Sequence, residues 1–350
     1  MRSSSANPLC SSRRLGRPGP SPATACGAHH PRRCAACSMS ARTRYDRDVR
    51  RTRQAPASAG GLALIALAAV SWGTSGSVMT VLAARAAASP LLVGVARLWV
   101  AAILLLLAAA ASRQSLAAAT AGDRWRWLAM GACMAGYQAA YFTAVTLSGI
   151  TTTALVAICS APLLIAALAP WLLGERLTTR GRLALGLGVT GTALLVSAPA
   201  TVSDGSARFL AGALLALIAG LAYALFVLTA KAGLARTAPL PLTALTFAAG
   251  AVLLTPALLW TDAPGRQLAI GWPWLLYLGG VATAGAYGAY TVGLGRVPAS
   301  VAGIVTLLEP LTATILGVAL FGEKLGAPAV AGAGLLVGAL GLLLSDGQAR

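Results

Sequence analysis

Apolar segments of about twenty residues follow one another along most of this 350-residue chain. A helix of that length is long enough to cross the hydrocarbon core of a bilayer. Only 10% of the residues are charged, whereas a soluble domain carries about 25%. A soluble fold of this size could not cover its surface with so few charges. The chain is therefore predicted to be an all-α integral membrane protein that crosses the bilayer many times.

Charges and Gly/Pro turns divide the apolar sequence into ten predicted transmembrane helices. The turns between the third and fourth spans and between the eighth and ninth are very short, so these two divisions are the least defined. The expected spans are 62–82, 91–111, 127–147, 150–173, 183–200, 209–230, 240–261, 272–294, 299–321 and 327–345.

One segment occurs twice, half a chain apart. Residues 160–177 read SAPLLIAALAPWLLGERL and residues 308–325 read LEPLTATILGVALFGEKL, with seven of eighteen positions identical. A collinear match at this separation indicates duplication. We expect two repeats, 61–200 and 209–345. Five spans per repeat is an odd number, so the second repeat enters the membrane inverted, an arrangement typical of transporters.

The first 58 residues form a tail rich in Arg, Ser and Pro, without apolar periodicity, and are expected to be disordered. Twelve of the 27 basic residues lie there, which accounts for much of the net charge of +18. A tail leading straight into a membrane span favours a cytoplasmic anchor over nucleic-acid binding. Met39 is an alternative start, in which case the preceding residues are an over-extended gene start.

The basic residues also predict the orientation of the chain. Outside the tail, ten fall on the side that holds the termini and four on the other side, and Arg97 lies within a span. Loops rich in Lys and Arg remain in the cytoplasm. Both termini are therefore expected to be cytoplasmic, in a multi-pass protein of the cell membrane.

These features resemble the EamA-type branch of the drug/metabolite transporter superfamily. The resemblance is carried by the two five-span units, by Trp72-Gly73 in the first span, by Arg97 in ARLWVAAILLL, and by the paired segments that end in GERL and GEKL. It covers about residues 61–345. It implies a ten-helix fold with a central cavity, often in an exporter of amino acids, other metabolites or drugs. One departure is Ala161, which stands where the second repeat has Glu309.

Glu309 is the sharpest functional candidate. It lies in an apolar run directly before Pro310, and carboxylates within a membrane usually face a cavity and mark an ion or substrate path. Pro310 donates no amide hydrogen bond and is expected to kink the helix. The functional interpretation is a site for proton coupling or for a substrate amine. The structural alternatives are a carboxyl group hydrogen-bonded between helices, or a residue at the end of a helix if the ninth span starts later than placed here.

Arg97 and a set of aromatic and amide residues are further candidates for substrate binding. Arg97 could bind a carboxylate, extend to the interface, or bond to carbonyls of a broken helix. Aromatic walls with polar tips suit amphipathic or cationic ligands, and close helix packing is the alternative. The other candidates in this set are Trp72, Tyr137, Gln138, Tyr141, Tyr223 and Tyr287.

Six residues of the repeated segment are assigned to architecture. A glycine that ends a helix suits a C-cap, and the charges that follow it are expected to fix the turn and its depth in the bilayer. These residues are Pro162, Pro310, Gly174, Glu175, Gly322 and Glu323.

Several other functions are disfavoured by the residues that the sequence lacks. Both histidines lie in the tail, where the spacing of His29, His30, Cys34 and Cys37 matches no familiar zinc finger. The aspartates fall in predicted loops and tails, and no nucleotide-binding motif is present. We expect no metal, no cofactor and no enzymatic activity. The prediction is a secondary transporter of small molecules, with a non-transporting scaffold or accessory subunit as the alternative, and a homodimer remains open.

Overall fold

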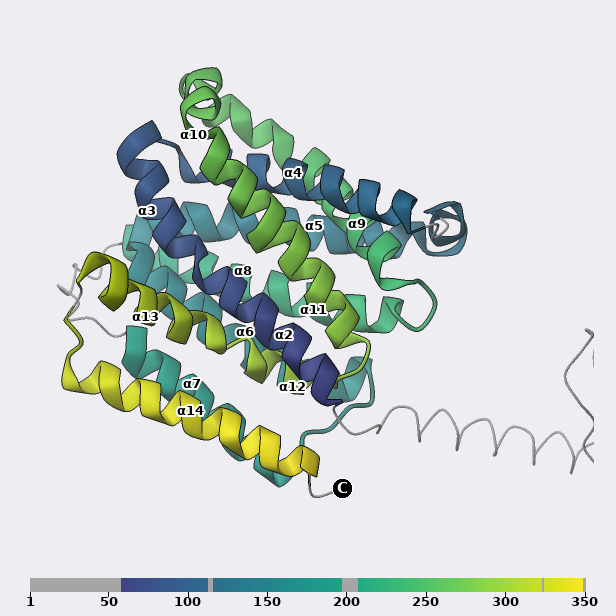
Figure 1. Ribbon diagram of the computed structural model, residues 1–350, viewed down its shortest axis with the longest axis vertical. Coiled ribbons are helices and arrows are strands. Elements are labelled where there is room, and N and C mark those ends of the chain that lie inside the picture. The colour runs from purple at the N-terminus through teal and green to yellow at the C-terminus, as the bar shows by residue number, and fades with distance from the viewer. Residues whose placement is uncertain (1–57, 113–115, 197–206, 323, 349–350) are drawn as a thin grey trace, which may run out of the picture. The chain divides into compact units, whose positions relative to one another are not determined.

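The computed structural model describes residues 58–112, 116–196, 207–322 and 324–348. The predicted tail lies outside these ranges except for Ser58. Within them all regular structure is helical (Figure 1). In chain order the elements are α2 (Ala59–Gly73), α3 (Ser75–Ala86), α4 (Pro90–Ala111), α5 (Leu116–Ser148), α6 (Ile150–Leu172), α7 (Thr179–Val196), α8 (Ala207–Gly233), α9 (Pro239–Leu254), η2 (Thr255–Trp260), α10 (Pro264–Gly279), η3 (Gly280–Gly285), α11 (Ala286–Leu294), α12 (Ala299–Val305), α13 (Leu308–Phe321) and α14 (Ala327–Gln348).

Local chemistry accounts for where several of these helices begin. The hydroxyl of Ser58 accepts a hydrogen bond from the Gly61 amide at 3.1 Å, which caps α2. The hydroxyl of Ser89 does the same for the Leu92 amide at 3.2 Å. Pro90 then occupies the first position of α4, where its missing amide hydrogen costs nothing.

The predicted seventh span passes from α9 into the 3₁₀ helix η2, and three other predicted spans are interrupted, which was expected only near Pro310. The first breaks at Thr74, whose hydroxyl donates to the Ser71 carbonyl at 2.7 Å and lies 2.9 Å from the Tyr277 hydroxyl. The eighth starts earlier than predicted and contains the π-helix η3 between α10 and α11. The ninth breaks between α12 and α13. A π-helical turn within an α-helix is often found at functional sites.

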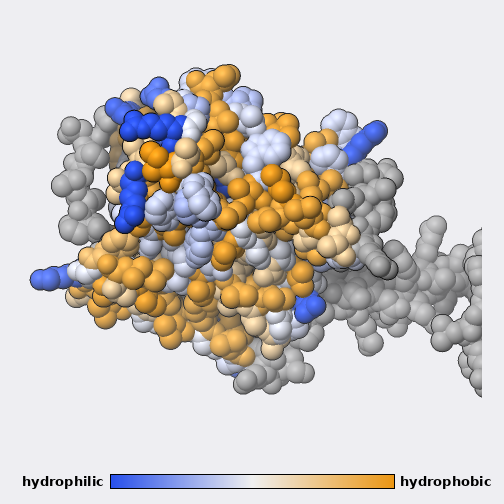
Figure 2. All heavy atoms as spheres, turned by 45° about the horizontal axis from the view of Figure 1, so that its top comes forward, coloured by the Kyte–Doolittle hydropathy of each residue, from blue (hydrophilic) through white to orange (hydrophobic). Residues whose placement is uncertain are grey.

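Eight helical segments within the described ranges are long and apolar enough to cross a membrane. The predicted spans 127–147 and 183–200 correspond to α5 and α7, which are not among the eight, and each of these two helices carries two arginines. Large apolar side chains lie on the molecular surface, including Leu107 at 61% exposure and Trp171 at 87%. In Figure 2 hydrophobic side chains cover much of the visible face. Such a surface suits contact with lipid rather than water.

The helices pack in partnerships that repeat between the two halves of the chain. The contact of α5 with α8 corresponds to the contact of α11 with α2. The contact of α6 with α8 corresponds to that of α13 with α2, and the contact of α5 with α9 corresponds to that of α10 with α4. Three further pairs join corresponding helices of the two halves: α4 with α9, α6 with α12, and α7 with α14. Figure 1 shows α7 and α14 side by side. The packing is therefore consistent with a pseudo-twofold axis that relates the two halves.

Close helix contacts depend on particular glycines. A Cβ on Gly191 of α7 would lie 2.7 Å from the Gly332 carbonyl oxygen of α14, and one on Gly332 would lie 2.5 Å from the Gly191 carbonyl oxygen. Only hydrogen side chains allow two backbones to approach this closely. Gly334 and Gly338, four residues apart on α14, face open space. The α7–α14 contact therefore depends on Gly191 and Gly332 and not on these two glycines.

Candidate functional site

A cavity of about 760 Å³ lies between the two halves of the chain. Helices from both repeats contribute to its wall, among them α2, α4, α5 and α6 from the first and α8, α11 and α13 from the second. All eight residues that the sequence proposes for substrate or proton binding line it. They are Trp72, Arg97, Tyr137, Gln138, Tyr141, Tyr223, Tyr287 and Glu309.

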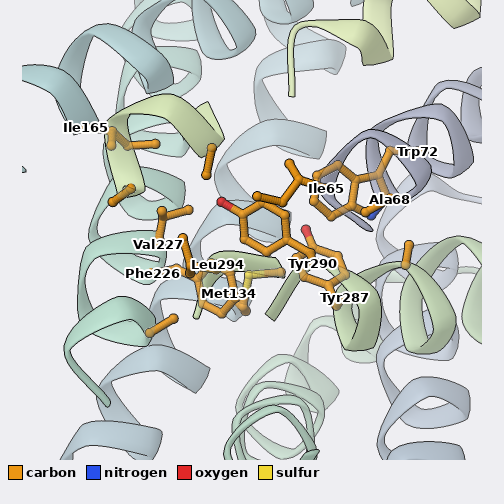
Figure 3. Packing of buried hydrophobic residues seen from close by; sticks show 14 of the residues in the cluster. Ile65, Ala68, Trp72, Met134, Ile165, Phe226, Val227, Tyr287, Tyr290 and Leu294 are labelled. Carbon is orange, nitrogen blue, oxygen red and sulfur yellow. The ribbon is translucent and has the colours of Figure 1, made fainter. Parts of the chain in front are cut away.

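The aromatic residues of the wall form a continuous set of ring contacts. The ring centroids of Trp72 and Tyr287 lie 4.7 Å apart, and those of Trp72 and Tyr223 lie 6.4 Å apart. Tyr137 lies 5.8 Å from both Tyr141 and Tyr223. Figure 3 shows Trp72 near Tyr287 and Tyr290 of α11. Rings at these separations make favourable edge and tilted contacts, so the wall is a continuous aromatic surface.

Several buried polar groups in this wall, among them the indole Nε1 of Trp72 and the hydroxyl of Ser75, have no hydrogen-bond partner among the described residues. Both residues line the cavity. A buried polar group without a partner is costly, and water or a ligand in the cavity would satisfy it.

Glu309 lies at a break in the helix that crosses beside the cavity. α12 ends at Val305 and α13 begins at Leu308, and the Glu309 amide donates to the Thr306 carbonyl at 3.0 Å. Pro310, the next residue, supplies no amide hydrogen, which fits a helix that restarts here. Glu309 occupies the first turn of α13, where the positive end of the helix dipole favours a carboxylate.

The first repeat forms the same wall without an acid and without a break. Ala161 and Pro162 line the cavity from α6, which runs uninterrupted through Pro162. Pro310 lines it as well, so both prolines assigned to architecture also border the cavity. The departure noted in the sequence thus leaves one carboxylate, rather than a symmetric pair, at this level of the cavity.

Arg97 of α4 is held by a residue that the sequence analysis missed. Its Nε donates to the Thr283 hydroxyl at 3.0 Å, and that hydroxyl donates to the Leu278 carbonyl at 2.7 Å. Thr283 lies in η3, where the wider π-helical turn leaves the Leu278 carbonyl in reach five residues back. Close approach assists the contact, since a Cβ on Gly279 would collide with the Val100 side chain. The one sign of this contact in the sequence was a lone threonine, Thr283, in a stretch of small residues.

Replacing Thr283 with valine should destabilise the protein by about 1–3 kcal/mol, because the partly buried guanidinium of Arg97 loses its partner. Thr291 is a matched control, since its hydroxyl donates to the Tyr287 carbonyl at 2.7 Å and bonds no charged side chain among the described residues. Thr291→Val should cost about 1 kcal/mol. Unfolding of the purified variants in detergent measures both, and equal losses would contradict a distinct role of Thr283 in holding Arg97.

The cavity reaches one end of the helix bundle and stops short of the other. Its lining includes Ala83 from the last turns of α3, Val145 near the end of α5, Thr151 at the start of α6 and Val196 at the end of α7. At the opposite end, a turn formed by residues 295–298 joins α11 to α12, and none of its residues lines the cavity.

The two glycines of the repeated turn adopt the left-handed conformation, with φ of 69° at Gly174 and 67° at Gly322. Glu175, however, does more than fix a local turn. Its Oε2 accepts a hydrogen bond of 2.6 Å from the Ala299 amide at the start of α12. The equivalent Glu323 lies outside the described residues.

Burial is the main influence on the Glu175 carboxyl and raises its pKa above the ordinary value. The Ala299 amide and the charge of Lys231 act in the opposite direction. A raised pKa means that burial disfavours the charged carboxylate, and these two partners offset part of that cost. The interaction is invisible in the sequence because 124 positions separate Glu175 from Ala299.

Comparison with known proteins agrees with these observations. A profile of the EamA-like transporter family matches residues 59–197 and again 210–345. An uncharacterized transporter of Bacillus subtilis (strain 168), YwfM, is 36% identical over 289 residues, which cover 82% of this chain and 93% of the relative. An uncharacterized transporter of Archaeoglobus fulgidus is 30% identical over 170 residues, 58% of its length.

The fold is also similar to that of a solved crystal structure. That structure superposes with a TM-score of 0.73 at 20% identity, and the match covers 83% of this chain and 99% of the other. At this identity the likeness concerns the fold alone. The resemblance read from the sequence is confirmed by the two profile matches: this chain belongs to the EamA-like transporter family, a branch of the drug/metabolite transporter superfamily.

Proposed function

We propose that the protein is a secondary transporter that exports small metabolites, such as amino acids and related compounds, or drugs, across the cell membrane by alternating access. The observation that carries this proposal is the cavity between the two halves, which reaches one end of the bundle and is closed at the other. A central site that is open to one side at a time is the arrangement that alternating access requires.

The proposed topology is ten spans in two inverted repeats of five, with α5 and α7 as spans three and five. Two observations support it: the packing partnerships that repeat between the halves, and the excess of basic residues on one side. An odd number of spans in each repeat inverts one repeat with respect to the other. With both termini cytoplasmic, the α11–α12 turn faces the cytoplasm and the cavity opens outward.

The chemistry of the wall favours a cargo with both apolar and charged parts. Arg97 offers a cation for a carboxylate, and Glu309 offers an anion for an amine or a place for a transported proton. The aromatic wall around Trp72 adds apolar area and can stabilise a cationic group.

Metabolite profiling tests the proposal while the chemical identity of the cargo is still open. A host that expresses the protein should release a class of compounds that an empty-vector host retains. Ala154→Trp places a large side chain in the cavity from α6 and should abolish this release. Ala167→Trp introduces the same side chain at an exposed position of α6 and should preserve it. No difference from the empty vector, inside or outside the cell, would favour a scaffold or accessory subunit.

A further inference from the structure

Hydrogen bonds from three residues, Glu175, Lys231 and Ser58, hold the turn of residues 295–298 and the start of α12. We call this set of hydrogen bonds the latch. The carboxylate of Glu175, in the loop between α6 and α7, accepts from the Ala299 amide at 2.6 Å. The ammonium of Lys231, in the last turn of α8, donates to the carbonyls of Leu294 and Val297, both at 2.7 Å. The amide of Ser58 donates to the Arg296 carbonyl at 3.3 Å.

The charges of the latch suit the two helix ends that they bind. Lys231 places a cation at the C-terminal end of α11, and Glu175 places an anion at the N-terminal end of α12. Each charge faces the helix terminus of opposite partial charge, and each hydrogen bond is charge-assisted. Both side chains are partly buried, so these bonds are less screened than bonds at an open surface.

The latch joins the two halves of the chain at the closed end of the cavity. Glu175 belongs to the first repeat and Ser58 directly precedes it, whereas the turn and Lys231 belong to the second. The contact between halves is tight, because a Cβ on Gly61 would lie 2.7 Å from Val297 Cγ2. Opening this end of the cavity requires the turn to separate from the first repeat, and the Glu175–Ala299 bond spans that division.

One short helix connects the latch to the cavity. α12 begins at Ala299, directly after the turn, and ends at Val305. The break at residues 306–307 follows, and then Glu309. Thr306 and Glu309 both line the cavity. At its start α12 is held by the Glu175–Ala299 hydrogen bond, and at its end the helix is interrupted beside Glu309. A helix with a hydrogen bond that can be lost at one end and an interruption at the other can turn as a unit.

We propose that α12 is the gate at this end of the transporter, held shut by the Glu175–Ala299 bond and supported by Lys231. The gate pivots about residues 306–307, so that a change at Glu309 is transmitted to the latch. This inference rests on the transport function proposed above. It adds the residues that control access on the side facing the α11–α12 turn.

Two engineered cysteines report the state of the gate in a full-length chain whose native cysteines have been replaced. Ser300→Cys introduces a thiol of similar size at a buried site in α12, where exposure is 2%. Thr80→Cys introduces one at an exposed position of the cavity wall toward the open end. The reagent is a cationic, water-soluble methanethiosulfonate, applied to the protein purified in detergent.

With Glu175→Ala, labelling at the Ser300→Cys reporter should become about tenfold faster, the factor expected when a hydrogen bond to a charged group is lost. Labelling at the Thr80→Cys reporter should become slower, since opening one end closes the other. Glu175→Gln retains an acceptor for the Ala299 amide and should have a smaller effect of the same sign. Arg176→Gln removes the adjacent exposed charge and should change neither rate.

Unchanged labelling at the Ser300→Cys reporter in both Glu175 variants would overturn the gate. Faster labelling at both reporters would also overturn it, because that pattern reports general loosening of the fold. The experiment needs no substrate, so its failure is separate from failure of the transport proposal. A latch that responds as expected in a protein that moves no compound would contradict transport alone.

Discussion

Glu309→Gln is expected to abolish gradient-driven transport while the amount of protein in the membrane stays unchanged. The amide has nearly the same shape as the carboxyl group, but it carries no charge and exchanges no proton. In a cavity lined by apolar and aromatic groups, loss of one charged partner reduces affinity by about tenfold to a hundredfold. Release of the transported compound into the medium, compared with wild type at matched abundance, measures the effect.

Two further measurements separate the possible roles of Glu309. If the carboxyl group carries a proton, Glu309→Gln should still exchange substrate across the membrane in the absence of a gradient. If it binds an amine of the substrate, exchange should be lost together with net transport. Glu309→Asp keeps the charge and should retain part of the activity in either case. Wild-type transport with unchanged pH dependence in Glu309→Gln would remove the residue from both roles.

Gly191→Ala is expected to destabilise the protein by about 1–3 kcal/mol, the usual cost of forcing an extra methyl group into a packed contact. The new Cβ would meet the Gly332 carbonyl oxygen at 2.7 Å and the Leu336 amide nitrogen at 3.0 Å. Backbone atoms of α14 cannot rotate away as a flexible side chain can. The two helices would therefore have to separate along the contact between α7 and α14.

Gly334→Ala on α14 is the matched control, with the opposite expected sign. No described atom lies within 4 Å of the position that its Cβ would take. Alanine is favoured over glycine in a helix interior by about 0.5–1 kcal/mol, so this variant should be neutral or more stable. Unfolding in detergent compares the two substitutions. A similar loss in both would show that space at the α7–α14 contact does not decide the effect.

The candidate residues Glu309 and Arg97 could be singled out in the sequence because each is unusual in its local setting. Glu309 is an acid and Arg97 a base within apolar runs, and the cost of such groups in lipid points to a cavity. The structure brings both to one cavity, together with the six aromatic and amide candidates. Thr283 gave no comparable signal, because a single threonine in an apolar helix is common and inexpensive.

Glu175 shows the limit of interpreting a motif from its local pattern. The glycine before it does end a helix in the left-handed conformation, as a glycine at a helix end favours. The carboxylate itself reaches a helix that begins 124 positions later. The position of that helix depends on the break at residues 306–307 and on the packing of α6 against α12. Neither of these is encoded in the turn.

The sequence by itself determined the membrane class, the internal repeat and the family, because the length of an apolar run, a repeated segment and the family profile are all properties of the chain order. The tertiary structure decided which residues share a cavity, which end of that cavity is closed, and which hydrogen bonds lie at the closed end. Those properties arise from side chains far apart in the sequence. They meet only after helix breaks and close glycine contacts have set the position of each helix.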